Sequence, residues 1–167
     1  MDWYVRRLGP GDAAVFQALR LEGLAAHPCA FAASHDEEAG QSLVDVAARL
    51  ERQPVFGGFA DGALLGIAGF AVPAPAKKRH KGLLWGVYVR EAARSQGLGR
   101  ALVIRVIEHA RAHVLQLHVA VVTTNHAALG LYRTLGFTTY GLEPRGLACT
   151  GRYFDQELLV LLLDRER

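Results

Sequence analysis

Two glycines and two arginines lie close together in the run Arg94-Ser95-Gln96-Gly97-Leu98-Gly99-Arg100, between an apolar segment and a long amphipathic one. Glycine lets the backbone turn tightly and approach a ligand closely. If a helix begins here, the amides of residues 95 to 100 have no acceptor within it. With the positive end of the helix dipole, they favour a phosphate or pyrophosphate. The run therefore predicts an anion-binding loop. The alternative is a plain strand-to-helix turn with solvated arginines.

Two other phosphate-binding motifs fit this run poorly. A dinucleotide-binding fingerprint needs G-x-G-x-x-G and an acidic residue about 20 positions later. Here the glycines come late, and the downstream segment is Val114-Leu-Gln-Leu-His-Val. A phosphate loop needs Gly-Lys-Ser/Thr, whereas Gly99 is followed by Arg100-Ala101. Neither motif is assigned.

Asn125 and Tyr132 lie on a second predicted helix, over residues 126 to 135. Asn125 is placed to cap its N-terminus. Ala128, Leu131, Tyr132 and Leu135 follow the spacing of one helical face, so the tyrosine ring is expected to point inward. Such a tyrosine either acts in chemistry or belongs to the core with its hydroxyl bonded to a backbone carbonyl.

With the pattern R/Q-x-x-G-x-G/A, the chain resembles the GNAT superfamily of N-acetyltransferases. Further landmarks match in order: the strand-like residues 83–90, Asn125, and Leu131-Tyr132-Arg-Thr-Leu-Gly136-Phe137, which is similar to the family's L-Y-x-x-x-G-F. Together they cover roughly residues 82 to 140, and the first 80 residues match more loosely. The resemblance implies one domain over residues 1–167 with acetyl-CoA as acetyl donor.

The resemblance also implies how the donor is held. The loop amides would bind the pyrophosphate, the backbone of Val87, Tyr88 and Val89 would pair with the pantetheine arm and polarise the thioester, and Asn125 would bond the same arm. Tyr132 would act as general acid toward the departing thiolate. The loop residues are Arg94, Ser95, Gln96, Gly97, Leu98, Gly99 and Arg100.

A general base is not assigned. Residues 83–89 carry no carboxylate, so a strand-borne base is excluded. Asp36-Glu37-Glu38 is interpreted as a solvated acidic run before a helix rather than a site for a cationic amine. A water chain or no dedicated base is an equal alternative. The candidate side chains are Glu22, His35, Asp36, Glu37, Glu38, His80, His118 and Glu143.

Three functions follow from this. The leading one is acetyl transfer to a primary amine of a small molecule or of a protein or peptide. The alternatives are a non-catalytic acyl-CoA-binding module, and a toxin-like acetyltransferase of aminoacyl-tRNA, which would need more basic surface than Lys77–Lys81. Acceptor recognition is expected in residues 22–38 and in the loop 143–153. Trp85 and Tyr88 either line the acceptor pocket or pack in the core.

Composition indicates the cellular location of the protein and the classes of partner that it can bind. The 167 residues carry a net charge of +3, too small to favour a nucleic-acid partner. No stretch approaches the ~20 apolar residues of a membrane span, and the N-terminus lacks a signal-peptide core, so a cytoplasmic protein is expected. Cys29 and Cys149 are predicted to be reduced thiols, and no metal site is predicted. The apolar run 158–163 indicates a buried final strand that can approach a homodimer interface.

The elements that must position these residues alternate along the chain. The pattern predicts a mixed α/β fold: a mostly antiparallel sheet of about six to seven strands, flanked by about four helices. Asp12, Ser42 and the glycine loop each precede a predicted helix, and Asp61-Gly62 is a predicted hairpin turn. The predicted strands are residues 2–8, 55–60, 63–72, 83–90, 115–122, 137–141 and 153–163.

Overall fold

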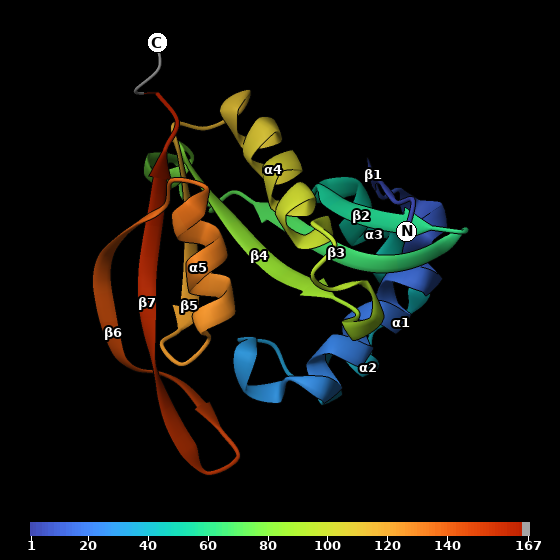
Figure 1. The fold of residues 1–167 in the computed structure, drawn as a ribbon, viewed down its shortest axis with the longest axis horizontal. Helices are drawn as coiled ribbons and strands as arrows, with labels where there is room; N and C mark the ends of the chain where they lie inside the picture. Colours follow the sequence, from blue (N-terminus) through green and yellow to red (C-terminus); the bar gives the residue numbers. More distant parts are fainter. Residues whose placement is uncertain (165–167) are drawn as a thin grey trace.

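A single twisted sheet runs through the centre of the computed structural model, which describes residues 1–164 (Figure 1). It has seven strands in the order β1-β2-β3-β4-β5-β7-β6. All neighbours are antiparallel except β4 and β5, which are parallel. The strands are β1 (Tyr4–Arg7), β2 (Val55–Ala60), β3 (Ala63–Ala71), β4 (Lys81–Val89), β5 (Gln116–Val122), β6 (Thr138–Cys149) and β7 (Arg152–Leu162).

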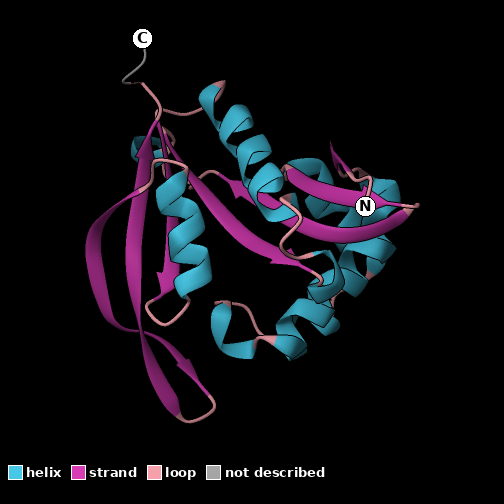
Figure 2. Cartoon of the chain, viewed as in Figure 1, coloured by secondary structure: helices cyan, strands magenta, loops and turns pink. Residues whose placement is uncertain are grey.

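Helices cover both faces of this sheet (Figure 2). In Figure 1, α4 and α5 lie in front of the sheet, and α1 and α3 lie behind it. The buried residues form two apolar clusters, one under α4 and α5 and one under α1 and α3. Residues 1–164 contain five α-helices rather than about four: α1 (Ala13–Ala26), α2 (His35–Ala39), α3 (Leu43–Arg52), α4 (Leu98–Arg111) and α5 (His126–Thr134).

Local signals explain most of these elements. Leu98, Leu102, Val106 and Ala110 recur every four residues, and all four are buried at 0 or 1% exposure along the inner face of α4. The predicted turn between β2 and β3 is confirmed, because Asp61 and Gly62 both have positive φ angles, 51° and 77°. Periodicity and turn chemistry thus predict the helix and hairpin that flank the site.

The segment before the last strand differs from its prediction. Residues 143–153 were expected to form a loop, but β6 continues to Cys149 and turns into β7 through Thr150 and Gly151, which have φ angles of 51° and 74°. The pairing shifts between Glu143 and Leu147. This bulge accommodates Pro144, which has no N–H for the ladder, and Arg145 N instead donates to Asp155 Oδ1 at 2.8 Å.

The prediction of reduced cysteines is wrong. Cys29 and Cys149 form a disulfide bond, with Cα atoms 5.5 Å apart and a sequence separation of 120. Their spacing gave no sign of pairing, because the fold alone brings the short 3₁₀ turn Pro28–Ala30 beside β6. Within residues 1–164, no helix is long and apolar enough to cross a membrane.

Candidate active site

A wedge opens between the two parallel strands. β4 pairs with β5 only where Lys81, Gly82 and Leu83 face Gln116, Leu117 and His118. Beyond that point the strands diverge, as Figure 1 shows, and β5 continues its pairing with β7. One backbone edge of β4, from residue 84 to 89, therefore has no strand beside it. Two adjoining cavities of ≈ 500 and ≈ 580 Å³ fill the wedge, and both are lined by Val87, Tyr88 and Val89.

A bulge in β4 decides which side chains face each side of the wedge. Ile67 of β3 is opposite Tyr88 and Gly69 is opposite Trp85, so Gly86 and Val87 together face the single residue between them. Gly86 has a φ angle of 65°, which glycine adopts without strain. Strict alternation would put Trp85 and Tyr88 on opposite faces. The extra residue instead turns both toward the α1 side, where both pack.

The glycine run forms the predicted helix start. Gly97 is the N-cap of α4 with a φ angle of 82° and no side-chain cap, and Ser95 also has a positive φ of 61°. The first helical bond runs from Ala101 N to Gly97 O, at 3.0 Å. The amides of residues 98 to 100 therefore have no helical acceptor, which makes this end suited to an anion. The cavity is lined here by Arg94, Ser95, Gly97, Gly99 and Arg100.

Two loop residues contribute through their backbone. The Leu98 side chain is 1% exposed and packs in the core under α4. The Gln96 carbonyl accepts a hydrogen bond from Trp3 Nε1 at 3.1 Å, and Gln96 is not among the residues that line the two cavities. The Leu98 side chain and the Trp3 indole thus fix the loop, and no sequence pattern indicates the contact with Trp3.

Arg94 connects the loop to β4 and to the end of α1. Its Nε donates to Val89 O at 2.9 Å, and its Nη2 lies 3.1 Å from His27 Nε2. Arginine only donates, so His27 Nε2 is the acceptor in this contact. His27 lines one of the cavities and lies within residues 22–38, where acceptor recognition is expected, although the sequence did not single it out. The sequence feature that distinguishes His27 is its position directly before Pro28.

Asn125 is the N-cap of α5, as predicted. Its Oδ1 accepts from Ala128 N at 3.2 Å, and the residue lines both cavities. The cap uses the carbonyl oxygen of the side chain, so the amide nitrogen is left to face a ligand. The two roles considered for Asn125 are therefore compatible.

Tyr132 lies inside the wedge and is 4% exposed. Its ring packs on Phe137 with the centroids 5.6 Å apart. Burial raises the pKa of its hydroxyl far above the ordinary value, and no hydrogen bond to that hydroxyl is found within residues 1–164. The hydroxyl is therefore not bonded to a backbone carbonyl, while the ring belongs to the apolar cluster under α4 and α5.

The eight candidate bases lie outside the two cavities. His118 is occupied by Gln116 and Tyr140, at 2.7 and 3.2 Å, and burial with the nearby Lys81 and His80 lowers its pKa. The described residues hold no group of three or more His, Cys, Asp or Glu side chains that could bind a metal ion.

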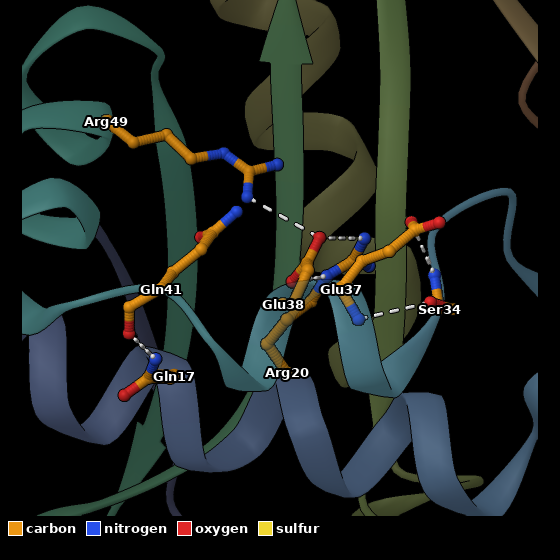
Figure 3. A network of polar contacts seen from close by, with 7 residues as sticks. All are labelled: Gln17, Arg20, Ser34, Glu37, Glu38, Gln41 and Arg49. Carbon is orange, nitrogen blue, oxygen red and sulfur yellow. Dashed lines mark hydrogen bonds and ion pairs between the residues drawn. The ribbon is translucent and has the colours of Figure 1, made fainter.

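The interpretation of Glu38 as a solvated charge is wrong. Glu38 is 7% exposed and accepts two hydrogen bonds from Arg20, at 2.9 and 3.0 Å, while Arg49 lies 3.5 Å from its Oε1 (Figure 3). Burial works to raise the pKa of this carboxyl, but the two arginines outweigh it and hold the pKa below its usual range. Glu38 is therefore a poor base. Asp36 and Glu37 are exposed in the first turn of α2, as expected.

The chain is similar to several known proteins. L-methionine sulfoximine/L-methionine sulfone acetyltransferases of Pseudomonas aeruginosa and Pseudomonas paraeruginosa are each 34% identical over 128 residues, which is 76% of this chain and 74% of theirs. A GNAT-family acetyltransferase of Streptococcus pneumoniae has a TM-score of 0.86 at 26% identity, covering 97% of this chain and 99% of that one. The ribosomal-protein-alanine N-acetyltransferase of Brucella melitensis has a TM-score of 0.84 at 25% identity, covering 96% and 99%. The family model of the acetyltransferase (GNAT) family matches residues 17–137, and the chain belongs to this family of acetyltransferases.

Proposed function

We propose that this acetyltransferase moves the acetyl group of acetyl-CoA to the primary amine of a small molecule. The observation that carries the proposal is the wedge between β4 and β5, which has a free backbone edge on one side and an uncapped helix start at one end. A pantetheine arm carries two amides, and it ends in a pyrophosphate. The free edge offers partners to the amides, and the helix start offers donors to the pyrophosphate.

Each predicted donor-binding residue has a part in this arrangement. Val87, Tyr88 and Val89 present backbone groups to the pantetheine arm, although Val89 O is already bonded to Arg94. The amides of Leu98, Gly99 and Arg100 receive the pyrophosphate, and Gly97 lets the loop turn into the helix. Ser95 lines the cavity beside them, and Asn125 offers its side-chain amide to the arm.

The chemistry is direct transfer. The neutral amine attacks the thioester carbonyl, whose oxygen gains negative charge and is stabilised by a backbone N–H of the β4 bulge. The C–N bond forms and the nitrogen releases one proton to solvent, while the C–S bond breaks and negative charge develops on the departing sulfur. Tyr132 donates its proton to the sulfur and is reprotonated from solvent. Burial makes the tyrosinate costly, so the proton moves only as charge develops on sulfur.

A small-molecule acceptor is favoured over a protein. The relatives named for methionine sulfoximine and methionine sulfone share more identity with this chain than the protein-acetylating structural neighbour does. The disulfide also ties the segment after α1 to the β6–β7 hairpin, and Cys29 lines the cavity. This bridge limits the space through which an extended peptide would have to pass.

The cellular location and the oligomeric state of the protein stay predictions. The cytoplasmic location loses the support of reduced thiols, because the cysteines are paired. A homodimer through the last strand would have to use side chains, because both backbone edges of β7 are occupied, by β5 and β6.

The test is to incubate the protein with acetyl-CoA and a panel of primary amines, and to analyse the acceptors by mass spectrometry. The panel holds L-methionine sulfone, other amino acids, polyamines and N-terminal peptides. An added acetyl group on a small amine supports the proposal. Acetylation of peptides alone would replace the small-molecule acceptor with a protein, and acetylation of no amine would contradict the transfer itself.

A further inference from the structure

Three helices bring charged side chains together behind the wedge (Figure 3). Arg20 comes from α1, Glu38 from α2 and Arg49 from α3. Their side chains are 7, 9 and 23% exposed. Arg20 donates hydrogen bonds from Nε and Nη2 to the two carboxylate oxygens of Glu38, whereas Arg49 lies near only one of these oxygens. A bidentate pair of this kind fixes the plane and direction of the guanidinium.

The cluster carries a surplus positive charge, because two guanidinium groups face one carboxylate. Removing a charge from water is costly unless a partner compensates it. Arg49 retains more contact with solvent, and the indole of Trp85 lies 4.5 Å from its guanidinium carbon. Arg20 is the more buried of the two arginines. A buried surplus charge beside a cavity is best compensated by an anionic ligand.

Arg20 lies directly behind the wall of the cavity and is not itself one of the lining residues. Its guanidinium carbon lies 5.4 Å from the ring of Phe31 and 5.4 Å from the ring of Trp85, and both rings line the wedge. The nitrogen that Glu38 does not engage, Nη1, points at Gly86: a Cβ atom on this glycine would lie 3.1 Å from it. Gly86 is the bulge residue of β4 and also lines the cavity.

The same wall has a second donor that lacks an acceptor. Trp85 Nε1 is buried, and it has no hydrogen-bond partner within residues 1–164. Trp85 packs over Gly69 of β3, where a side chain would collide with the indole. Buried donors without acceptors cost free energy. This wall is therefore rich in donors and positive charge and poor in acceptors.

We propose that Arg20 is the acceptor-specificity residue, and that its Nη1 binds the carboxylate of an amino-acid acceptor beside Gly86. The inference rests on the proposed function and names its substrate class. In an α-amino acid the amine is one carbon away from the carboxylate. A carboxylate held at Gly86 therefore places the amine next to Val87, the bulge residue at which the thioester carbonyl is expected.

Glu38 and Arg49 are positioning residues in this account. Glu38 accepts hydrogen bonds from Nε and Nη2 of Arg20, and this orients the guanidinium so that Nη1 faces β4. Arg49 offsets the charge of Glu38, which would otherwise repel the acceptor carboxylate. Gly86 keeps the space before Nη1 open.

The test compares amino acids with their primary amides as acceptors, using L-methionine sulfone, L-phenylalanine and L-glutamine with acetyl-CoA. The amides retain the amine and side chain but lack the anionic group. We expect the wild-type protein to favour the acid form of its best acceptor in kcat/KM by about 10- to 100-fold. Equal use of acid and amide, or use of amides alone, would overturn the inference.

Two variants assign the preference to Arg20. Arg20→Gln with Glu38→Gln removes both members of the most buried ion pair and leaves only the more exposed charge of Arg49, and Arg20→Lys keeps the charge but loses the fork. Both are expected to lose the acid preference through KM of the acid, with KM of the amide nearly unchanged. Arg52→Gln removes an exposed charge from α3, the helix that carries Arg49, and should keep the preference. A preference that survives both Arg20 variants would overturn the assignment.

Acetyl-CoA binding, measured by calorimetry, separates this inference from the proposed function. A merely structural role of Arg20 would lower kcat/KM for acid and amide alike, and would also overturn the assignment. If the protein acetylates only amides and simple amines, the proposed acetyl transfer to small amines still holds, but the inference that Arg20 binds an acceptor carboxylate fails. If wild-type protein binds acetyl-CoA but acetylates no amine, both fail.

Discussion

Cys29 and Cys149 form a disulfide that joins two distant parts of the chain. Cys29 lies in the turn after α1 and Cys149 at the end of β6, so the disulfide spans from the α1 layer to the β6–β7 hairpin. The wedge opens between these two parts, because β4 and β5 stop pairing after Leu83. The bond therefore limits how far the two parts can separate.

Loss of this bond is expected to destabilise the fold. The bridge closes a loop of 120 residues, and removing a long-range disulfide typically costs about 2–5 kcal/mol. Denaturant unfolding of the wild type, with and without a reductant, measures this difference, and the Cys29→Ser, Cys149→Ser variant should match the reduced protein. Thiol titration of non-reduced, unfolded protein should find no free thiol. Two free thiols would contradict the bond.

Gly99→Val is expected to weaken acetyl-CoA binding without unfolding the protein. A Cβ at this position meets only Val89 Cγ2, at an ordinary 3.6 Å, whereas a larger side chain would intrude on the anion at the helix start. We expect the dissociation constant to rise at least tenfold, with the thermal midpoint unchanged. Calorimetric titration measures it.

Gly97→Val serves as the contrasting variant. The φ angle of Gly97 is 82°, so a β-branched side chain is strained there whatever the ligand. This variant should lose both stability and affinity. If Gly99→Val folds normally and binds acetyl-CoA as tightly as the wild type, the loop does not hold the pyrophosphate.

Tyr132→Phe is expected to lower kcat by about 10²- to 10⁴-fold while leaving acetyl-CoA affinity nearly unchanged. The ring keeps its packing on Phe137, and only the proton donor is removed. Because burial raises the pKa of Tyr132, the wild type should show no loss of rate from this group up to about pH 10. Pre-steady-state thiol release measures the step. Equal rates in the two proteins would make Tyr132 a packing residue.

The Arg20–Glu38 pair is expected to make stability sensitive to acid. The pKa of Glu38 is lowered in the folded protein, so its contribution is present above the unfolded pKa of about 4.3 and is lost as pH falls through the lower folded value. The free energy of unfolding should therefore fall more steeply below about pH 4 in the wild type than in the Arg20→Gln, Glu38→Gln variant. Denaturant curves from pH 3 to 7 check this. Parallel pH profiles would show that Glu38 titrates normally.

Local patterns predicted much of the fold and the donor side of the site. Leu98 to Ala110, the Asp61-Gly62 turn and the Ser42 cap are each governed by residues a few positions apart, and the structure confirms them. The glycine loop and Asn125 are also local features, since each begins a helix.

The acceptor side could not be predicted in the same way. Glu38 was interpreted as solvated because it belongs to the acidic run Asp36-Glu37-Glu38, and its partner Arg20 is 18 residues away. The disulfide joins residues 120 apart, and the bulge at Gly86 depends on the register with β3. Each of these contacts arises from packing between distant segments, which leaves no periodic signal in the chain.

The most direct test of the account is the rate of thiol release from acetyl-CoA with and without an amine acceptor. We predict that wild-type protein releases thiol at least tenfold faster with one of the small amines than with buffer alone, and that Gly99→Val needs more acetyl-CoA to reach the same rate. Release that is slow and independent of every amine, from protein that binds acetyl-CoA, would contradict acetyl transfer and leave a non-catalytic acyl-CoA-binding module.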